Sequence, residues 1–163
     1  MNKPLACIPK IRGLSWDDKV AYLAYKASIV QGPSPLVTHS FQDIWYVKTM
    51  YLPAGTRLIG RKHIDGHILK LIQGKVVLLF EVGQKYYEAP DRIHSRPGDR
   101  MVAIAQTDII VEAWILNPDG ETDIDVIEAS VVEPADEILS RGKLIAAQVD
   151  NQLYAESILL SKD

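Results

Sequence analysis

The 163-residue sequence predicts a mainly β protein, an antiparallel β-barrel or jelly roll with an N-terminal helix and a helical or mixed C-terminal tail. Short runs rich in β-branched and aromatic residues follow one another through residues 41–132. Turns rich in Gly, Pro, Asn and Asp separate these runs, and helical spacing is confined to the two ends. Strands at near-regular spacing are typical of antiparallel sandwiches and barrels. We therefore expect an N-terminal arm and helix (1–40), a barrel (41–132) and a tail acting as an assembly element (133–163).

The N-terminal part is expected to be an arm followed by one helix. Ser15 is a predicted N-cap, because two acidic residues follow it in the first turn, where the helix dipole favours them. Apolar residues then recur at helical spacing to about Ile29. A connector rich in Gly and Pro, residues 31–35, is expected to end this helix.

The predicted strands of the barrel lie between turns with strong turn chemistry. The run at 75–81 is apolar on both faces, so it needs cover from a helix, a second sheet or a subunit. Residues 124–132 are expected to give a further strand, and residues 133–140 a short helix. Residues 143–160 fit either a helix or strand pieces. The earlier strands are expected at residues 43–51, 56–62, 67–72, 75–81, 85–88, 101–106 and 109–116.

Composition argues against several classes of protein. The formal net charge is −3 and Lys and Arg do not cluster, so direct nucleic-acid binding is not indicated. No apolar run approaches the ~20 residues that span a bilayer, and no secretory signal is visible, so we expect a protein made in the cytoplasm and not bound to a membrane. The single cysteine, Cys7, excludes an intrachain disulfide.

The most distinctive stretch holds two histidines four residues apart, His63 and His67, with turn chemistry at Gly66 between them. Side chains alternate along a strand, so Arg61 and His63 are expected on one face of the first strand. His67 shares its face with the leucines two and four residues later. If both imidazoles point inward, they converge at the mouth of an apolar interior, and neutral imidazole is the commonest side-chain metal ligand.

This spacing resembles the first signature motif of the cupin superfamily, in which two histidines one residue apart precede a Glu and then a Gly. Counting back from Gly74, His67 stands at the Glu position, His63 at the second His and Arg61 at the first. The resemblance implies a cupin-like β-barrel in which only about half of the family's metal-ligand positions hold residues that can ligate a metal.

A second part of the resemblance lies further along the chain. The turn at residues 96–98 resembles the Pro-x-Gly turn of the second cupin motif, and Met101 stands about where its His would be. The match covers roughly residues 46–116. More narrowly, the run LPAGT, the histidine spacing, an EAP corner and the PGD turn resemble small cupin-like proteins of tailed bacteriophages.

Candidate ligand-binding residues at the barrel mouth are Arg61, His63, His67, Met101 and His94. His63 and His67 would hold a divalent metal, with a carboxylate, His94, His39 or water completing the sphere. Arg61 cannot ligate a metal, and the Met101 thioether suits Cu(I) better than iron, manganese or zinc. An inward Arg61 could equally hold a carboxylate or a phosphate. The alternative is a structural pair of imidazoles, with His94 solvated in a loop and His39 in a linker.

Two further groups of residues have ordinary explanations. Trp45 and Trp114 could stack on a sugar, but we expect them in the core or at an interface. The alternating acids Glu121, Asp123 and Asp125 lack the glycine and bidentate Glu of a known Ca²⁺ loop, so we expect a solvated edge.

Two functional hypotheses follow. The first is a non-enzymatic structural or assembly protein, a bacteriophage virion component made in the host cytoplasm. It would form a homo-oligomer or contact other virion proteins, with no catalytic residue and no cofactor. The second is a metal- or anion-binding cupin enzyme that acts on a small metabolite or sugar through His63 and His67. We prefer the first, because the ligand set is incomplete.

Overall fold

A computed structural model describes residues 13–30 and 35–160, without the side chains of Ala135 and residues 151–160. The chain divides into two compact units. One comprises residues 32–134, and the other comprises residues 1–31 together with residues 135–163. The predicted arm with Cys7, up to residue 12, and the connector at 31–34 lie outside the described residues.

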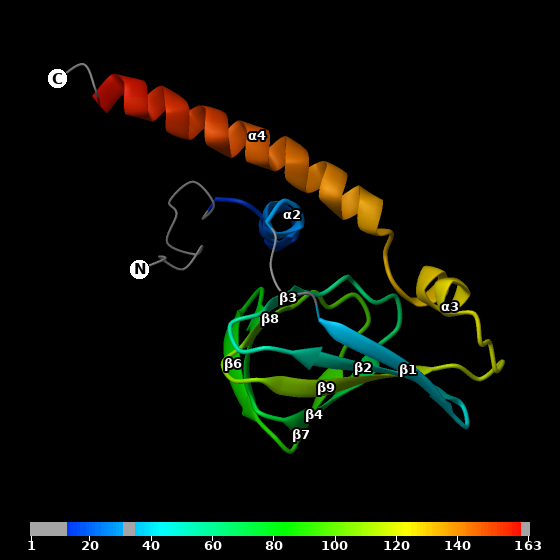
Figure 1. Cartoon of the computed structure of the whole chain (residues 1–163). Helices are drawn as coiled ribbons and strands as arrows, with labels where there is room; N and C mark the ends of the chain where they lie inside the picture. Colours follow the sequence, from blue (N-terminus) through cyan, green and yellow to red (C-terminus); the bar gives the residue numbers. More distant parts are fainter. Residues whose placement is uncertain (1–12, 31–34, 161–163) are drawn as a thin grey trace. The chain divides into compact units, whose positions relative to one another are not determined.

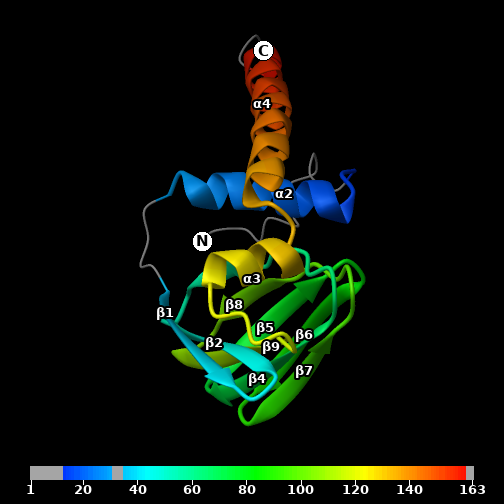
Figure 2. The same ribbon diagram turned by 90° about the vertical axis from the view of Figure 1, so that its right-hand side faces the viewer.

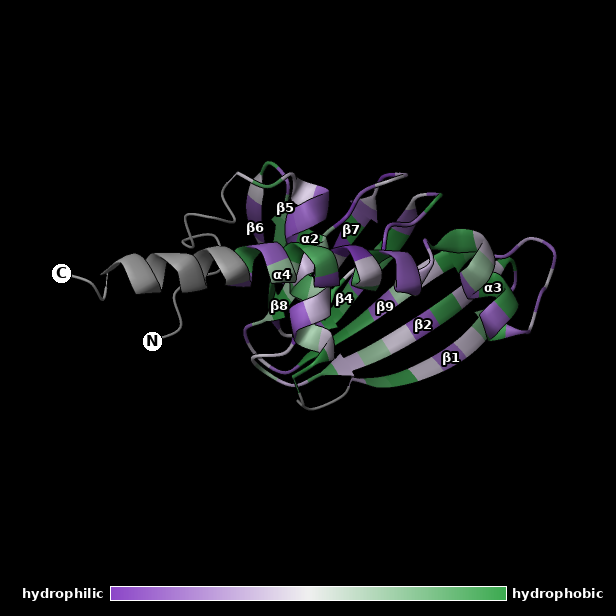
Figure 3. Cartoon of the chain, turned by 90° about the horizontal axis from the view of Figure 1, so that it is seen from above, coloured by the Kyte–Doolittle hydropathy of each residue, from purple (hydrophilic) through white to green (hydrophobic). Residues whose placement is uncertain are grey.

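The unit of residues 32–134 is a sandwich of two antiparallel sheets (Figures 1 and 2), which confirms the predicted fold class. The five-stranded sheet has the order β1-β2-β9-β4-β7 and the four-stranded sheet the order β3-β8-β5-β6. Figure 3 shows β1, β2, β9 and β4 side by side in this order. The strands are β1 (Leu36–Gln42), β2 (Trp45–Leu52), β3 (Arg57–Ile59), β4 (His67–Gln73), β5 (Lys75–Phe80), β6 (Gly83–Glu88), β7 (Asp91–Ser95), β8 (Val102–Ala105) and β9 (Ile109–Leu116).

The core lies between the two sheets and follows from the alternation of side chains along the strands. In β9, buried and half-buried residues alternate over its first seven positions, with Ile109, Val111, Ala113 and Ile115 inside. Cross-strand pairing places Met50 of β2 opposite Val111, so both belong to the inner face. This period of two is what a half-buried strand requires.

Residues 124–131 form a helix, α3 (Ile124–Val131), so the strand predicted there is wrong. Asp123 is its N-cap, and its carboxylate accepts from two backbone N–H groups of the first turn. Ile124, Ile127 and Val131 fall on one helical face and pack on Tyr46. A short apolar run fits either period, and here the cap and the packing surface favour the helix.

The other unit contains α2 (Trp16–Ser28) and α4 (Ala135–Leu160). The predicted N-cap of α2 is confirmed, because the Ser15 hydroxyl accepts from the Asp18 backbone N–H at 3.2 Å. The tail that was expected to be helical or mixed is a single helix from Ala135 to Leu160, which takes the place of the short helix predicted at 133–140. None of the described helices is long and apolar enough to cross a membrane.

Helix α2 packs closely on α4, and Gly142 of α4 allows the short distance between the two helix backbones. A Cβ atom added at Gly142 of α4 would stand 2.0 Å from the Ala21 carbonyl oxygen of α2. An ion pair between Lys26 and Asp150, at 3.1 Å, links the same two helices. The close packing of α2 on α4 therefore depends on a small residue at position 142.

Candidate functional site

The predicted site residues Arg61 and His63 lie in a loop, residues 60–66, that joins β3 to β4. We call it the rim loop. The strand expected at 56–62 is therefore shorter than predicted. Neighbouring segments hold the loop from both sides: the Ile64 backbone N–H donates to the Val131 carbonyl at 2.9 Å, and the Gly98 N–H donates to the His63 carbonyl at 2.9 Å. The backbone of His63 is thus fixed by contacts distant in sequence.

Glu133, which follows α3, fastens the same loop through its side chain. It forms a bidentate ion pair with Arg100, with N–O distances of 2.5 and 2.6 Å. Its carboxylate also accepts from the Lys62 backbone N–H at 2.9 Å. Arg100 is only 8% exposed, so loss of Glu133 would leave a buried charge without its main partner. Neither residue stands out in the sequence, because nothing local distinguishes a buried arginine from a solvated one.

His63 and His67 lie together as a stacked pair. Their ring centroids are 3.7 Å apart and their planes are inclined by 22°. Burial lowers the pKa of His63 to about 4, and the charges of Arg61 and Lys48 act in the same direction. Burial also lowers the pKa of His67 to about 4, with a smaller effect of His63. Both rings are therefore neutral at pH 7.

The stacked pair does not fit a resident metal ion. A metal binds imidazole along a lone pair in the ring plane, and two nearly parallel rings with centroids 3.7 Å apart cannot both direct such a lone pair at one ion ~2.0–2.1 Å from each nitrogen. Within residues 13–30 and 35–160, no group of three or more His, Cys, Asp or Glu side chains could hold a metal ion. In this stacked arrangement the two imidazoles therefore do not fit a shared divalent metal.

Glu128 of α3 is a member of this site that the sequence analysis missed. Its carboxylate pairs with Lys48 of β2 at 2.8 Å and with the Arg61 guanidinium. Burial opposes ionisation of Glu128, but hydrogen bonds and charge from Lys48 and Arg61 outweigh it, so the net effect is a lowered pKa. We call Lys48, Arg61, His63, His67 and Glu128 the rim cluster. The sequence did not reveal this cluster because residues 124–132 were predicted to form a strand, and the direction of the Glu128 side chain could not be inferred from that prediction.

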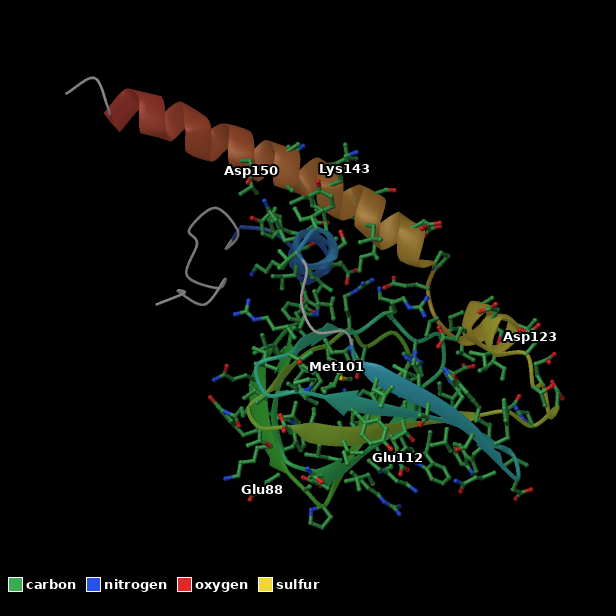
Figure 4. The ribbon with its side chains drawn as sticks, in the orientation of Figure 1. Glu88, Met101, Glu112, Asp123, Lys143 and Asp150 are labelled. Atoms are coloured by element: carbon green, nitrogen blue, oxygen red, sulfur yellow. The ribbon has the colours of Figure 1, made fainter. Side chains whose placement is uncertain are left out.

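The rim cluster borders a cavity of about 210 Å³ in the interior of the sandwich. Most of the lining is apolar and comes from inner-face residues of both sheets, among them Leu69, Leu71, Leu78 and Ala113, together with Met101 just before β8. Leu69 and Leu71 share the face of His67, as the alternation predicts. Figure 4 shows Met101 inside the sandwich, where it is 9% exposed. Met101 thus lies in the wall of the same cavity as the stacked pair.

Two other predicted candidates lie elsewhere. His94 is exposed on β7 between the buried residues Ile93 and Ser95, so it points to the outer face of its sheet. His39 lies within β1 rather than in a linker, and its Nδ1 is hydrogen-bonded to the Tyr46 hydroxyl at 2.7 Å. The structure therefore brings together Arg61, the stacked pair and Met101, and leaves both of these histidines away from the cavity.

Comparisons with known proteins match the fold but no family. No protein-family model and no curated protein matches the chain. Its neighbours among solved structures are cupin superfamily proteins. A cupin superfamily protein from Desulfitobacterium hafniense is 12% identical, with a TM-score of 0.47 over 56% of this chain and 87% of that one. An RmlC-like cupin from Shewanella frigidimarina is 13% identical, with a TM-score of 0.47 over 60% and 85%.

The salicylate 1,2-dioxygenase of Pseudaminobacter salicylatoxidans has a TM-score of 0.50, with 12% identity, over 68% of this chain and 33% of that chain. At such identity the likeness concerns the fold alone. The matched structures therefore bear on the fold and do not assign the chain to the cupin superfamily. The narrower resemblance to bacteriophage proteins stays a prediction.

Proposed function

We propose that this chain is a non-enzymatic structural protein whose cupin-like sandwich is a rigid block in a larger assembly. The sequence resemblance suggests the virion of a tailed bacteriophage as that assembly. The supporting observation is that the groups of the rim cluster are bound to one another. Glu128 joins the two cations, and each imidazole is covered by the other.

Such a cluster has a clear structural role. Lys48 belongs to β2, Arg61 to the rim loop and Glu128 to α3, so the ion pairs connect three segments far apart in sequence. A catalytic acid or base needs instead a free site within hydrogen-bond reach of a substrate. Here the charged groups already have partners, and the two neutral imidazoles stack on each other.

The direct test is the location of the protein. We expect particles purified from cells that encode this chain to contain it in a fixed number of copies, measured by quantitative mass spectrometry and by gold-labelled antibody. Elemental analysis of the purified chain is expected to show less than stoichiometric metal. Absence of the chain from particles, or one bound metal that is lost in the double variant His63→Ala/His67→Ala with the fold intact, would contradict the proposal.

A second candidate function rests on the cavity. A dry cavity of ~150 Å³ can bind benzene, so 210 Å³ is enough for a small, mostly apolar molecule. Within the described part of the chain, His67 Nδ1 is buried without a hydrogen-bond partner, and a polar group of a ligand would satisfy it. A sugar fits poorly, because apolar walls would leave its hydroxyl groups unpaired.

This candidate has its own test. Titration with 1-hexanol, followed by calorimetry and by NMR of the imidazole rings, is expected to show saturable binding if the cavity is a ligand site. The variant Ala113→Leu fills the cavity and is expected to abolish binding, whereas Ala129→Leu on the exposed side of α3 leaves it unchanged. Binding that survives Ala113→Leu would place the ligand elsewhere, and absence of binding would remove this candidate.

A further inference from the structure

One of the four sheet edges lacks the features that normally prevent edge strands from pairing with another chain. Such features are shortness, charged side chains, proline and bulges. The edge strand β3 has only three residues. The edge strand β6 contains Lys85 and Glu88, and β7 contains Asp91 and Arg92, all of them exposed. Three edges are therefore protected by shortness or charge.

The fourth edge is β1, Leu36–Gln42, and it is unprotected. It has seven residues without a charged residue or a proline, and its register with β2 is continuous from the first residue to the last. All of its residues except Val37 are exposed. Figure 3 shows β1 at the border of the five-stranded sheet, with β2 on its other side. Among the described residues, no strand other than β2 pairs with β1, so nothing in that part of the chain covers its outer row of backbone N–H and C=O groups.

Apolar side chains on this strand and beside it are also exposed. Leu36 is 63% exposed and Phe41 is 43% exposed within β1. Tyr51, the cross-strand partner of Leu36, is 39% exposed, and Ile44 in the adjoining turn is 43% exposed. Exposed apolar side chains on both faces of the sheet next to an open edge favour β-augmentation, in which main-chain hydrogen bonds and flanking apolar contacts act together.

We propose that the open edge of β1 pairs antiparallel with β1 of a second copy of this chain, so that two five-stranded sheets join across a two-fold axis. The midpoint of Leu36–Gln42 is His39, so full-length pairing places the axis there. Thr38 then faces Ser40 of the second copy, and Val37 faces Phe41. The inner pairs match in character in this register, because Thr38 and Ser40 are both small and polar and Val37 and Phe41 are both apolar, whereas Leu36 faces Gln42 at the two ends.

The absence of formal charge on β1 favours pairing with β1 of a second copy over pairing with a charged strand. A strand with no formal charge meets no like-charge repulsion when it pairs with itself. The pairing does not rest on the proposed function, because a ligand-binding protein with the same open edge would pair in the same way. Two seven-residue strands bury less than the ~1,600 Å² of a standard interface, so the dimer is expected to depend on concentration.

Sedimentation velocity of the full chain, from low micromolar to near-millimolar concentration, tests the pairing. The wild type is expected to shift from monomer to dimer. In Thr38→Lys/Ser40→Lys the introduced lysines face each other across the axis, and the dimer is expected to weaken at least tenfold. The matched variant Thr38→Lys/Ser40→Glu places opposite charges in the same positions and is expected to restore the dimer. Circular dichroism and thermal unfolding verify that both variants fold.

A cross-link provides an independent readout of the register. In a Cys7→Ser background, His39→Cys brings the two introduced thiols directly opposite each other, at a separation that a disulfide can bridge. We expect a covalent dimer on mild oxidation. Ser40→Cys, whose counterpart lies two positions away along the partner strand, is expected to stay monomeric.

Three results would overturn the proposed pairing or its register. A wild type that stays monomeric at the highest concentration overturns the proposal. A dimer that is unaffected by the double-lysine variant, or one that the lysine–glutamate variant fails to restore, overturns it as well. Cross-linking through Ser40→Cys but not through His39→Cys would exclude the His39-centred register.

Discussion

Glu128 offers the sharpest test of the rim cluster, through the substitution Glu128→Gln. The change keeps the size of the side chain and removes its charge. Lys48 and Arg61 then lose their shared partner, and two cations are left close to each other. The neutral amide can still donate and accept hydrogen bonds, so the loss is mainly electrostatic.

The magnitude follows from burial. The three side chains are 24–33% exposed, which places them between surface pairs and fully buried pairs. Exposed pairs contribute about 0.2–1 kcal/mol, and removal of one partner from a buried pair costs about 3–5 kcal/mol. We therefore expect a loss of about 2 kcal/mol in the free energy of unfolding. For a unit of this size, that loss corresponds to a fall of roughly 10 °C in Tm.

Thermal and urea unfolding of the full chain, followed by tryptophan fluorescence, measure this loss. The matched control is Glu88→Gln, because Glu88 pairs with Lys75 at 3.8 Å on an exposed part of β6. That substitution is expected to change stability by less than about 0.5 kcal/mol. Equal effects of the two substitutions would refute the view that the rim cluster stabilises the sandwich. A more stable Glu128→Gln variant would indicate that the cluster is maintained for binding.

Three other predictions concern the stacked pair and two glycines. The folded-state pKa values of the stacked pair, about 4, lie below the usual 6.5, so the unfolded chain binds more protons between these values. The contribution of the pair to stability is complete above pH 6.5 and falls by about 1–2 kcal/mol, after allowance for solvent screening, as pH drops towards 4, measured by urea unfolding at several pH values. His63→Asn/His67→Asn should reduce this dependence and leave the part that comes from Glu128, whose pKa is also lowered. Gly74 has φ +88° and a Cβ there would stand 2.3 Å from the Asp108 carbonyl oxygen, so Gly74→Ala should lower Tm clearly more than Gly120→Ala, which has φ +69° and open space. Gly142→Ala should separate α2 from α4 and expose both to limited proteolysis, with the fluorescence of the sandwich unchanged.

Much of the sandwich could be predicted from the sequence because its signals are local. The alternation in β9, the turn residues and the N-cap at Ser15 each act within a few residues, so α2 and most strands appear close to where they were expected. Two strands were missed: β1 was taken as a linker and β7 as a loop. Residues 124–131 show the limit of this reasoning. Their apolar positions fit a strand or a helix, and contact with Tyr46, about 80 positions earlier, favours the helix.

In the candidate site, too, some features could be predicted from local sequence and others depend on contacts between distant segments. The spacing of His63 and His67 indicated two imidazoles at one end of the interior, and the structure brings them together. Their stacking, and with it the absence of a common metal position, depends on how the rim loop is held by Val131, Gly98 and Glu133. None of these contacts leaves a pattern in the sequence around the histidines.

The sequence by itself determined the antiparallel strands, the first helix and the two imidazoles beside an apolar interior, because periodicity and turn chemistry are properties of neighbouring residues. Only the tertiary structure decided that Glu128 joins Lys48 and Arg61, and that β1 is left with an open edge. Ion pairing and strand order depend on the distance in space between segments far apart along the chain, and that distance is set by packing of the whole unit.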